Sequence, residues 1–384
     1  MFKSANVNPL ITVCIPVYET ERFLLQCLES VYKQDFYSFE ILIVSDASPG
    51  RDQKGRKAKK LIKIAEKDCK LYRKAKQLPP VKFRFIEHSE NRGLIEVRRT
   101  LATQARGVYT TQVDSDDEME AGALSALYKA ALETGADLVH GTSTAGVFDQ
   151  EGNFNPTKEN RYGKIFYGTI LGRDIFHRWL IGGEFTANTW GKLIKREIFL
   201  KAYEHIPYTE CNMADDVLLF FFIAQYTKKY LGIENKVYRY RVNTGMSSGR
   251  KIDTIRKWKM ICTTASVFTV ISQWIENNND TINALQADEV EKVRGMTRYY
   301  LLNNLKQMNE VVIPELKEEA RALLCEYWGE SFVERMEAAS AANAPRAANA
   351  PRAANAASES SEPQAASEPQ STNPPNSASA AVEK

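Results

Sequence analysis

The 384-residue chain lacks the residue patterns that identify zinc proteins, dinucleotide-binding dehydrogenases and membrane-spanning proteins. Its six cysteines form no CxxC pair, its four histidines share no metal-ligand spacing, and no GxGxxG follows the first apolar segment. No apolar run approaches the roughly 20 residues that span a bilayer, and the polar start gives no secretory signal. We therefore expect reduced thiols and a cytoplasmic protein, either free or peripheral on the inner face of a membrane.

What the chain does contain is an alternation of strand-like and helix-like segments in its first 140 residues. Continuous apolar, β-branched runs indicate buried strands, whereas apolar residues three or four positions apart indicate helices. The expected strands are 11–17, 40–45, 81–86, 109–113 and 136–140, and the expected helices are 21–33, 94–105 and 121–134. Such an alternation predicts an α/β fold, in which helices cover both faces of a mostly parallel sheet.

The rest of the chain divides by composition. Residues 141–170, rich in Gly, Asn and Thr, are expected to form a mobile cover, and 236–242 alternates like an edge or mixed strand. Long helices are expected at 252–277, 287–308 and 315–336. After about residue 337, repeats of Ala-Ala-Asn-Ala-Pro-Arg and a Ser-, Glu-, Pro- and Gln-rich stretch predict disorder. The expected organisation is an α/β domain over 1–250, a helical region over 251–336 and a tail over 337–384.

Acidic side chains follow two of the expected strands at the point where each strand ends. Asp46 follows the second strand, and Asp114-Ser115-Asp116-Asp117 follows the fourth. Ligands of parallel α/β sheets bind beyond the carboxyl ends of the strands, so we expect a site at this edge. Closely spaced carboxylates repel one another, and a divalent cation relieves that repulsion. The alternative for 114–117 is an N-cap and acidic first turn of the next helix, and these residues alone leave both open.

Four short motifs occur together in a specific order and spacing. They are Ile11–Glu19, Ile43–Ser48, Glu90–Leu94 and Val113–Asp117. This series resembles glycosyltransferase family 2 on the GT-A fold, over roughly residues 10–245. The resemblance implies that 1–250 is a catalytic GT-A domain. It also implies an inverting transfer of a sugar from a nucleotide diphosphate sugar, with UDP as the expected nucleotide.

The resemblance also assigns residues to the donor. Family members hold the nucleotide base at the end of the first strand and at an acidic turn after the second, where Ser45 and Ala47 replace the usual Asp and Gly. Arg99 likewise stands where Asn is usual. The family's Asp-x-Asp corresponds to Asp114 and Asp116: Asp116 is the first choice for Mn²⁺ or Mg²⁺, and Asp114 for the metal or the ribose. The nucleotide-sugar residues implied are Pro16, Val17, Tyr18, Glu19, Asp46, Asn91, Arg98, Asp114, Ser115 and Lys192.

Two downstream motifs correspond to the family's acceptor and base segments. Thr189–Leu193 resembles its Trp-Asn-Lys-Leu segment, and Met213–Val217 resembles its Glu-Asp motif. These matches imply Asp216 as the catalytic base, with Trp190 and Asp215 at the acceptor.

Structural alternatives stay open for several of these residues. Trp190 also suits a core, Asp215-Asp216 also suits the acidic first turn of a helix, and Arg98-Arg99 also suits a solvated helix face. The stretch Tyr238–Ser247 resembles one in which some family members have a metal-binding His, and Asn243 stands near that place here.

The resemblance implies a metal-dependent hexosyl- or N-acetylhexosaminyltransferase. Its expected acceptor is a glycan or lipid-linked glycan in bacterial surface polysaccharide or lipooligosaccharide synthesis. A nucleotidyltransferase would have a Gly-rich, Arg-containing loop after the first strand, where this chain has Tyr18–Arg22. A non-catalytic nucleotide-sugar binder would not require the second acidic pair, Asp215-Asp216.

A basic stretch separates the second and third strands. Residues 51–76 contain twelve Lys or Arg against three acidic residues. The simplest interpretation is a solvated helix face, and the alternative is attachment to an anionic membrane surface. No interleaved aromatic pattern accompanies these cations, so no nucleic-acid partner is expected. The sequence does not indicate an oligomeric state.

Overall fold

The structure is a computed structural model, and it describes residues 8–149, 153–157, 163–242, 251–278 and 284–347. Residues 1–339 form one compact unit, and residues 340–384 are a second.

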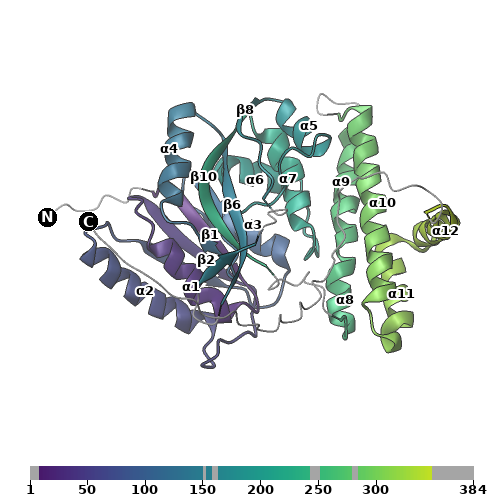
Figure 1. Ribbon diagram of the computed structural model, residues 1–384, viewed down its shortest axis with the longest axis horizontal. Coiled ribbons are helices and arrows are strands. Elements are labelled where there is room, and N and C mark those ends of the chain that lie inside the picture. Colours follow the sequence, from purple (N-terminus) through teal and green to yellow (C-terminus); the bar gives the residue numbers. More distant parts are fainter. Residues whose placement is uncertain (1–7, 150–152, 158–162, 243–250, 279–283, 348–384) are drawn as a thin grey trace, which may run out of the picture. The chain divides into compact units, whose positions relative to one another are not determined.

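One sheet organises the first unit (Figure 1). Within the described residues it has ten strands, in the order β3-β2-β1-β4-β9-β6-β10-β5, with β7 paired to β6 and β8 to β10. The strands are β1 (Ile11–Val17), β2 (Phe39–Ser45), β3 (Lys82–Glu87), β4 (Tyr109–Gln112), β5 (Glu118–Met119), β6 (Leu138–Phe148), β7 (Phe154–Pro156), β8 (Gly168–Leu171), β9 (Lys192–Lys195) and β10 (Lys229–Arg241). β1 is parallel to β2 and β4, and β6 to β10, whereas β9 lies antiparallel between β4 and β6. The start of β9 therefore lies at the same edge as the carboxyl end of β4.

Helices connect and cover these strands. They are α1 (Glu21–Tyr32), α2 (Ala58–Ala75), α3 (Leu94–Gln104), α4 (Ala123–Thr134), α5 (Asp174–Leu180), α6 (Arg196–Glu204), α7 (Asp215–Tyr226), α8 (Ile255–Cys262), α9 (Thr264–Asn278), α10 (Ala287–Glu310), the short 3-10 turn η1 (Pro314–Leu316), α11 (Lys317–Trp328) and α12 (Glu330–Ala347). The expected α/β fold of the GT-A type, with helices on both faces and further helices after it, is confirmed.

The central strands are apolar along their whole length because both of their faces are covered. Alternate residues of a strand point to opposite faces. Ile11, Val13 and Ile15 pack in a core with α1, α2 and α4, whereas Cys14 and Leu42 pack against α3 on the other face. The continuous apolar run from which the first strand was predicted thus reflects burial on two sides.

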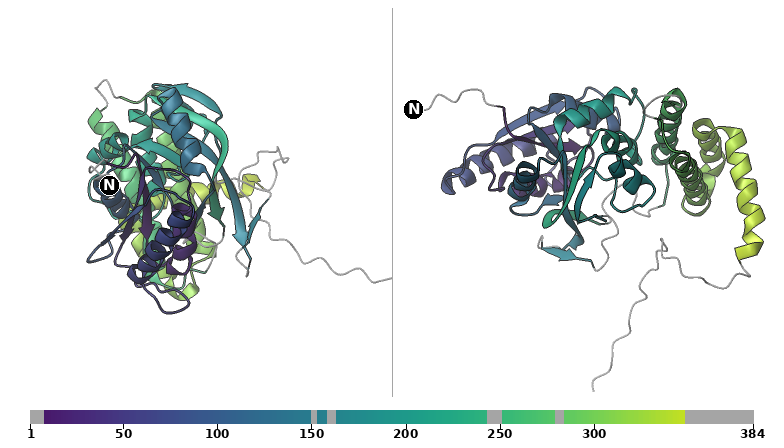
Figure 2. Two further views of the ribbon diagram at one scale, coloured as in Figure 1. Left: turned by 90° about the vertical axis from the view of Figure 1, so that its left-hand side faces the viewer. Right: turned by 90° about the horizontal axis from the view of Figure 1, so that it is seen from above.

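A second large core joins the sheet to the C-terminal helices. α7 is apolar around most of its circumference, which is typical of a helix buried on all sides. The ring of Phe221 lies 5.5 Å from that of Trp274 in α9, and Trp328 of α11 belongs to the same cluster. Figure 2 shows the green C-terminal helices, α9 and α11 among them, at one side of the sheet next to α7. The boundary expected at residue 250 stays a prediction, because this core extends across it.

The chain between α4 and α8 contains longer strands than the sequence predicts. β6 continues to Phe148 and β10 begins at Lys229, so the two form a long parallel pair. Residues 141–148, expected in a mobile cover, therefore lie in the sheet. The glycine at 141 conceals the strand pattern, yet the packing requires it: an added Cβ would lie 2.5 Å from a methyl group of Val237.

Two of the three long C-terminal helices are interrupted. The segment expected as one helix over 252–277 forms α8 and α9, and the one expected over 315–336 is divided at Gly329. Gly329 has φ 82°, a positive value that an α-helix cannot continue through and that glycine adopts easily. α12 then runs to Ala347, beyond residue 337, while residues 348–384 of the expected tail lie outside the described residues.

Within the described ranges, no helix is both long and apolar enough to cross a bilayer. All six cysteines are free thiols, and all but Cys325 are buried.

Candidate active site

The acidic run after β4 is held by the end of β10. The Asp117 carboxylate accepts hydrogen bonds from the Tyr238 hydroxyl at 2.8 Å and from the Arg241 backbone N–H at 2.7 Å. The Arg241 side chain donates to the backbone carbonyl of Asp116. Burial, together with the neighbouring Asp116 and Asp114 charges, raises the pKa of Asp117 well above its usual range. The second half of the sheet thus fixes the Asp-x-Asp segment and concentrates negative charge there.

Arg98 joins the two acidic motifs. Its guanidinium, 4% exposed, donates to Asp215 at 2.8 Å and to Asp114 at 3.1 Å. Burial alone would lower the pKa of Arg98, but the carboxylates of Asp114 and Asp215 outweigh burial and raise it. Residues just after β4, in α3 and at the start of α7 therefore meet in one ion-paired cluster, although they are far apart in the sequence.

The second acidic pair begins α7. The residue before it, Ala214, has φ 58°, an unusual left-handed conformation for alanine that turns the chain into the helix. Burial raises the pKa of Asp215 to about 6, with Arg98 opposing and Asp216 reinforcing the shift. Burial likewise raises the pKa of Asp216, although its carboxylate accepts the Val217 N–H at 2.8 Å. Burial thus makes both carboxyls hold protons more tightly than an ordinary aspartate does.

Lys192 lies inside the molecule near Asp216. Its side chain has no exposed surface, and its ammonium donates to the backbone carbonyl of Asn188. Burial lowers the pKa of Lys192 well below the ordinary lysine value, and the charge of Asp216 opposes that shift. Beside it, Trp190 is buried in a stack of rings, with centroids 4.7 Å from Tyr238 and 5.4 Å from Tyr240. Both predicted residues thus lie next to the acidic cluster, and both are enclosed.

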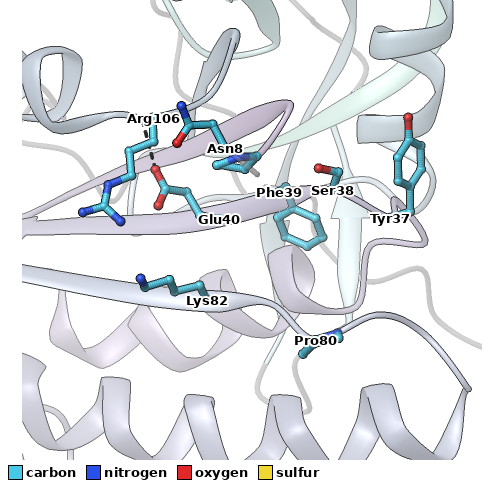
Figure 3. A pocket seen from close by; sticks show the side chains of 9 residues that line it. Asn8, Tyr37, Ser38, Phe39, Glu40, Pro80, Lys82 and Arg106 are labelled. Carbon is cyan, nitrogen blue, oxygen red and sulfur yellow. Dashed lines mark hydrogen bonds between the residues drawn. The ribbon is translucent and has the colours of Figure 1, made fainter. Parts of the chain in front are cut away.

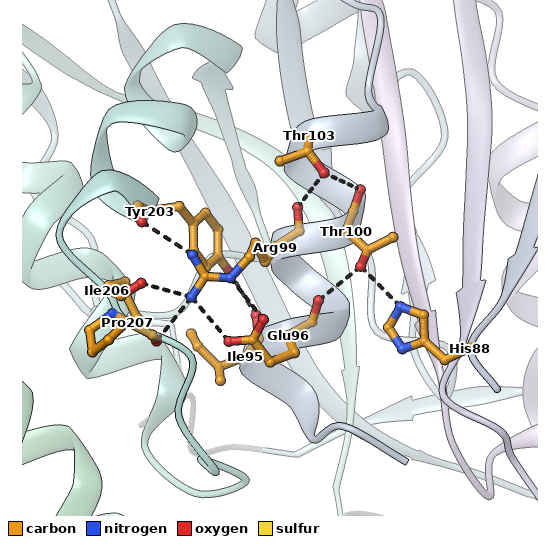
Figure 4. Close-up of polar contacts among 9 residues, drawn as sticks. All are labelled: His88, Ile95, Glu96, Arg99, Thr100, Thr103, Tyr203, Ile206 and Pro207. Carbon is orange, nitrogen blue, oxygen red and sulfur yellow. Dashed lines mark hydrogen bonds and ion pairs between the residues drawn. The ribbon is translucent and has the colours of Figure 1, made fainter. Parts of the chain in front are cut away.

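Asp46 fixes the loop that leads into α3. Its carboxylate accepts the backbone N–H groups of Arg92 at 3.0 Å and Gly93 at 2.9 Å, and it contacts Nδ1 of His88 at 2.7 Å. The other ring nitrogen of His88 contacts the Thr100 hydroxyl at 2.9 Å (Figure 4). These partners use most of the carboxylate's capacity to accept, so a contact of Asp46 with a nucleotide base stays a prediction.

Arg99, which departs from the family's usual Asn, attaches α3 to the end of α6. Its guanidinium pairs with Glu96 at 2.8 Å and donates to the backbone carbonyls of Tyr203, Ile206 and Pro207 (Figure 4). No local pattern indicates this role, because all three carbonyls lie more than 100 residues downstream.

The remaining predicted donor residues lie along the same edge. Pro16 and Val17 are buried in β1, Tyr18 is half-buried, and Asn91 is exposed. Glu19, with φ 56°, donates its N–H to the Ser48 hydroxyl at 2.8 Å. The Ser115 hydroxyl contacts that of Thr20 at 2.6 Å, which joins the ends of β4 and β1.

The carboxylates near β4 suit a cation whose other ligands come from elsewhere. No group of three or more His, Cys, Asp or Glu side chains in the described part of the chain could hold a metal ion by itself. Asp114 and Asp116 supply oxygen ligands, which Mn²⁺ and Mg²⁺ favour, and Mg²⁺ commonly uses one or two carboxylates with substrate phosphates and water. Asn243, near the family's occasional His ligand, lies outside the described residues.

A hollow on the surface lies away from this cluster. Figure 3 shows Glu40, Lys82 and Arg106 among the residues that line it, at the amino ends of the parallel strands. None of the predicted site residues lines this hollow.

Comparison with known proteins gives consistent matches. Residues 12–201, about half of the chain, match the family described as Glycosyl transferase family 2. The glycosyltransferase GlyA of Streptococcus pneumoniae is 27% identical over 247 residues, which cover 63% of this chain and 32% of that protein. The GalNAc(5)-diNAcBac-PP-undecaprenol beta-1,3-glucosyltransferase of Campylobacter jejuni is 30% identical over 166 residues, 43% of this chain and 45% of that protein. The chain thus spans about a third of the first relative's length and less than half of the second's.

Among solved structures, S. aureus TarS 1-349 in complex with UDP-GlcNAc has a TM-score of 0.45 and 17% sequence identity, and the match covers 86% of this chain and 92% of that one. The family match begins in β1 and ends in α6, so it includes the Asp-x-Asp segment, Arg98 and the Trp190–Lys192 turn. This chain belongs to glycosyl transferase family 2.

Proposed function

We propose that the protein transfers a sugar from a UDP-sugar, with inversion, to a hydroxyl of a glycan acceptor, and that it uses Mn²⁺ or Mg²⁺. The observation that carries this proposal is the double ion pair of Arg98, which draws the Asp-x-Asp segment and the Asp215-Asp216 pair into one cluster. Such a transfer requires two acidic groups at one reaction centre. One binds the metal ion that neutralises the leaving diphosphate, and the other removes the proton from the acceptor hydroxyl.

Asp216 is assigned as the general base. Its pKa, raised by burial, lies closer to the working pH than that of an exposed aspartate, which improves proton abstraction from a hydroxyl. Attack by that hydroxyl from the side opposite the leaving group inverts the anomeric carbon. Asp215 and Trp190 are assigned to the acceptor side, where Arg98 fixes Asp215.

Asp116, with Asp114, is assigned to the metal. A bound divalent cation supplies charge neutralisation for the departing diphosphate. Asp114 is bonded to Arg98, which holds its carboxylate at the end of β4. Asp116 is assigned as the principal ligand. The base and ribose are assigned to Tyr18 and the neighbouring residues at the end of β1, beside the Ser115–Thr20 contact.

The acceptor is proposed to be a lipid-linked glycan of a bacterial surface polysaccharide, handled at the inner face of the membrane. The name of the Campylobacter relative specifies an undecaprenol-linked acceptor for that protein. In this chain, α2 exposes a row of lysines that suits anionic headgroups; these are Lys59, Lys60, Lys63, Lys67, Lys70 and Lys74. We therefore propose a cytoplasmic protein that associates with the membrane through α2.

A thermal-stability screen tests the donor and metal assignments together. UDP, GDP and their common sugar conjugates are added to the full chain with Mn²⁺, with Mg²⁺ or with EDTA. UDP compounds with a divalent ion are expected to raise the melting temperature most, because ligands that bind only the folded state stabilise it.

The matched variants for this screen are Asp116→Asn and, at the opposite edge of the sheet, Glu40→Gln. Asp116→Asn should remove the metal-dependent part of the stabilisation, whereas Glu40→Gln should keep it. Equal stabilisation of both variants would contradict the metal assignment, and no response of the wild type to any nucleotide would contradict the function.

A further inference from the structure

The two cations that the family resemblance places near the leaving diphosphate are both enclosed. Arg98 is bonded to two carboxylates, and Lys192 donates to a backbone carbonyl and has no exposed surface. The neighbouring carboxylates would repel a diphosphate. An accessible cation at this edge would offset that repulsion and strengthen diphosphate binding.

The helical region supplies a rigid support close to the same edge. α8 is fixed to the rest of that region by Trp258, which is fully buried and donates its ring N–H to the Ala320 carbonyl at 2.8 Å. The chain just before α8 is also fixed, because Ile252 donates to Val311 at 3.0 Å and accepts from Ile313 at 3.1 Å. The backbone of the first turn of α8 therefore has a defined position.

Arg256 extends from this turn toward β1. Its guanidinium hydrogen-bonds the Tyr18 hydroxyl and lies 5.9 Å from the centre of the Tyr18 ring. The Arg256 side chain is exposed, and within the described residues no carboxylate lies in ion-pair range of it. Its neighbour Lys257, in contrast, pairs with Asp253 at 2.6 Å.

We propose that Arg256 binds a phosphate group of the donor's diphosphate, an inference that rests on the proposed function. A guanidinium binds phosphate through two parallel hydrogen bonds, and the contact with Tyr18 places it at the strand end assigned to the nucleotide. The helical region thereby contributes a donor-binding residue to the site, and Tyr18 orients that residue as well as lying beside the nucleotide.

The test is calorimetric titration of the full chain, in Mg²⁺, with UDP and with uridine. Arg256→Ala should weaken UDP binding about 10- to 100-fold, the loss expected for a hydrogen bond to a charged group, and should leave uridine binding unchanged. Arg256→Lys should recover part of the loss, because it restores the charge but not the paired donors. Lys257→Ala, on the same turn but paired with Asp253, is the matched control and should bind UDP like the wild type.

Unchanged UDP binding by Arg256→Ala would overturn the inference. So would equal losses for UDP and uridine, because these would assign Arg256 to the base and not to phosphate. Melting temperatures of the variants, measured without ligand, separate loss of binding from loss of fold. If the wild type binds no nucleotide, the proposed function fails, whereas normal wild-type binding with an unaffected variant rejects the role of Arg256 alone.

Discussion

The two edges of the sheet handle buried acidic groups in different ways. At the amino edge, the carboxylate of Glu40 accepts the Thr12 hydroxyl at 2.9 Å and the Arg106 N–H at 3.1 Å, and it pairs with Arg84 at 3.3 Å. Lys82 and Arg106 add positive charge at the hollow of Figure 3. At the carboxyl edge, Asp114 and Asp215 share the buried guanidinium of Arg98. The predicted site residues thus lie at the edge where carboxylates gather and not at the surface hollow.

The largest expected difference between the edges is in catalysis. Asp216→Asn removes the proposed base, so kcat should fall about 10²- to 10⁴-fold while metal-dependent UDP binding is kept. Glu40→Gln preserves the shape and acceptor oxygen at the amino edge and should retain wild-type kcat. Steady-state transfer rates and UDP titrations measure both quantities. Parallel loss of rate and UDP affinity in Asp216→Asn would exclude it as the base.

The next difference is in stability. Arg98→Met leaves the buried carboxylate of Asp215 and the half-buried carboxylate of Asp114 without their cation, which should cost about 3–5 kcal/mol of unfolding free energy. Arg84→Met should cost only about 1 kcal/mol, because Glu40 keeps its bonds from Thr12 and Arg106. Urea unfolding measures both changes. Similar losses of unfolding free energy in the two variants would show that Arg98 and Arg84 stabilise their edges to the same extent, contrary to this prediction.

The acidic pair of α7 also predicts a pH dependence. The folded-state pKa of Asp215, raised from 3.8 to about 6, exceeds its unfolded value, so the folded protein binds the proton more tightly. The resulting stabilisation is complete below about pH 4 and is lost as the pH rises through about 6. Asp215→Asn should therefore flatten the fall of unfolding free energy between pH 4 and 6, as measured by urea unfolding at several pH values. An unaltered slope would show that Asp215 does not titrate in this range.

The same protonation should limit activity. A base must be ionised to accept a proton, so the transfer rate should rise with pH through the apparent pKa values of the Asp215–Asp216 pair. A rate independent of pH between 5 and 8 would contradict this assignment.

The smallest expected effect concerns the basic helix near the amino edge. The last turn of α2 lies near the amino edge of the sheet. Its Arg73 donates a hydrogen bond to the carbonyl of Pro79, which comes just before the start of β3. Lys63→Ala should weaken binding to vesicles that contain anionic lipid by about 1 kcal/mol, or roughly fivefold. Lys292→Ala, an exposed lysine of α10, should have no effect. Cosedimentation with and without anionic lipid measures both variants, and equal effects would assign the binding to net charge alone.

The sequence predicted those parts of the molecule in which the local residue pattern alone specifies the secondary structure. Residues 11–17 form a strand because an unbroken apolar run suits a strand buried on both faces, and that is where the structure has β1. β6 was predicted too short because Gly141 interrupts its pattern, and the need for glycine there comes from Val237, which lies far along the chain. Local patterns contain no information about such a distant contact.

The candidate site divides in the same way. The order of the short motifs was enough to select the Asp-x-Asp segment and the Asp215-Asp216 pair, which the structure brings together. It could not indicate that Arg98 bonds both, that Lys192 is enclosed, or that Arg256 reaches Tyr18, because each contact depends on packing between distant elements. The roles assigned to the site residues remain predictions until the variants above are measured.

The reversed direction of β9 has a consequence for how such a protein diversifies. Because this strand runs opposite to β4, the turn at 188–191 arrives at the carboxyl edge from a separate stretch of chain. Insertions or substitutions between α5 and β9 would reshape the proposed acceptor side while the register of β1, β2 and β4, beneath the proposed donor site, stays intact. New acceptors could therefore evolve without rebuilding the machinery for the sugar nucleotide.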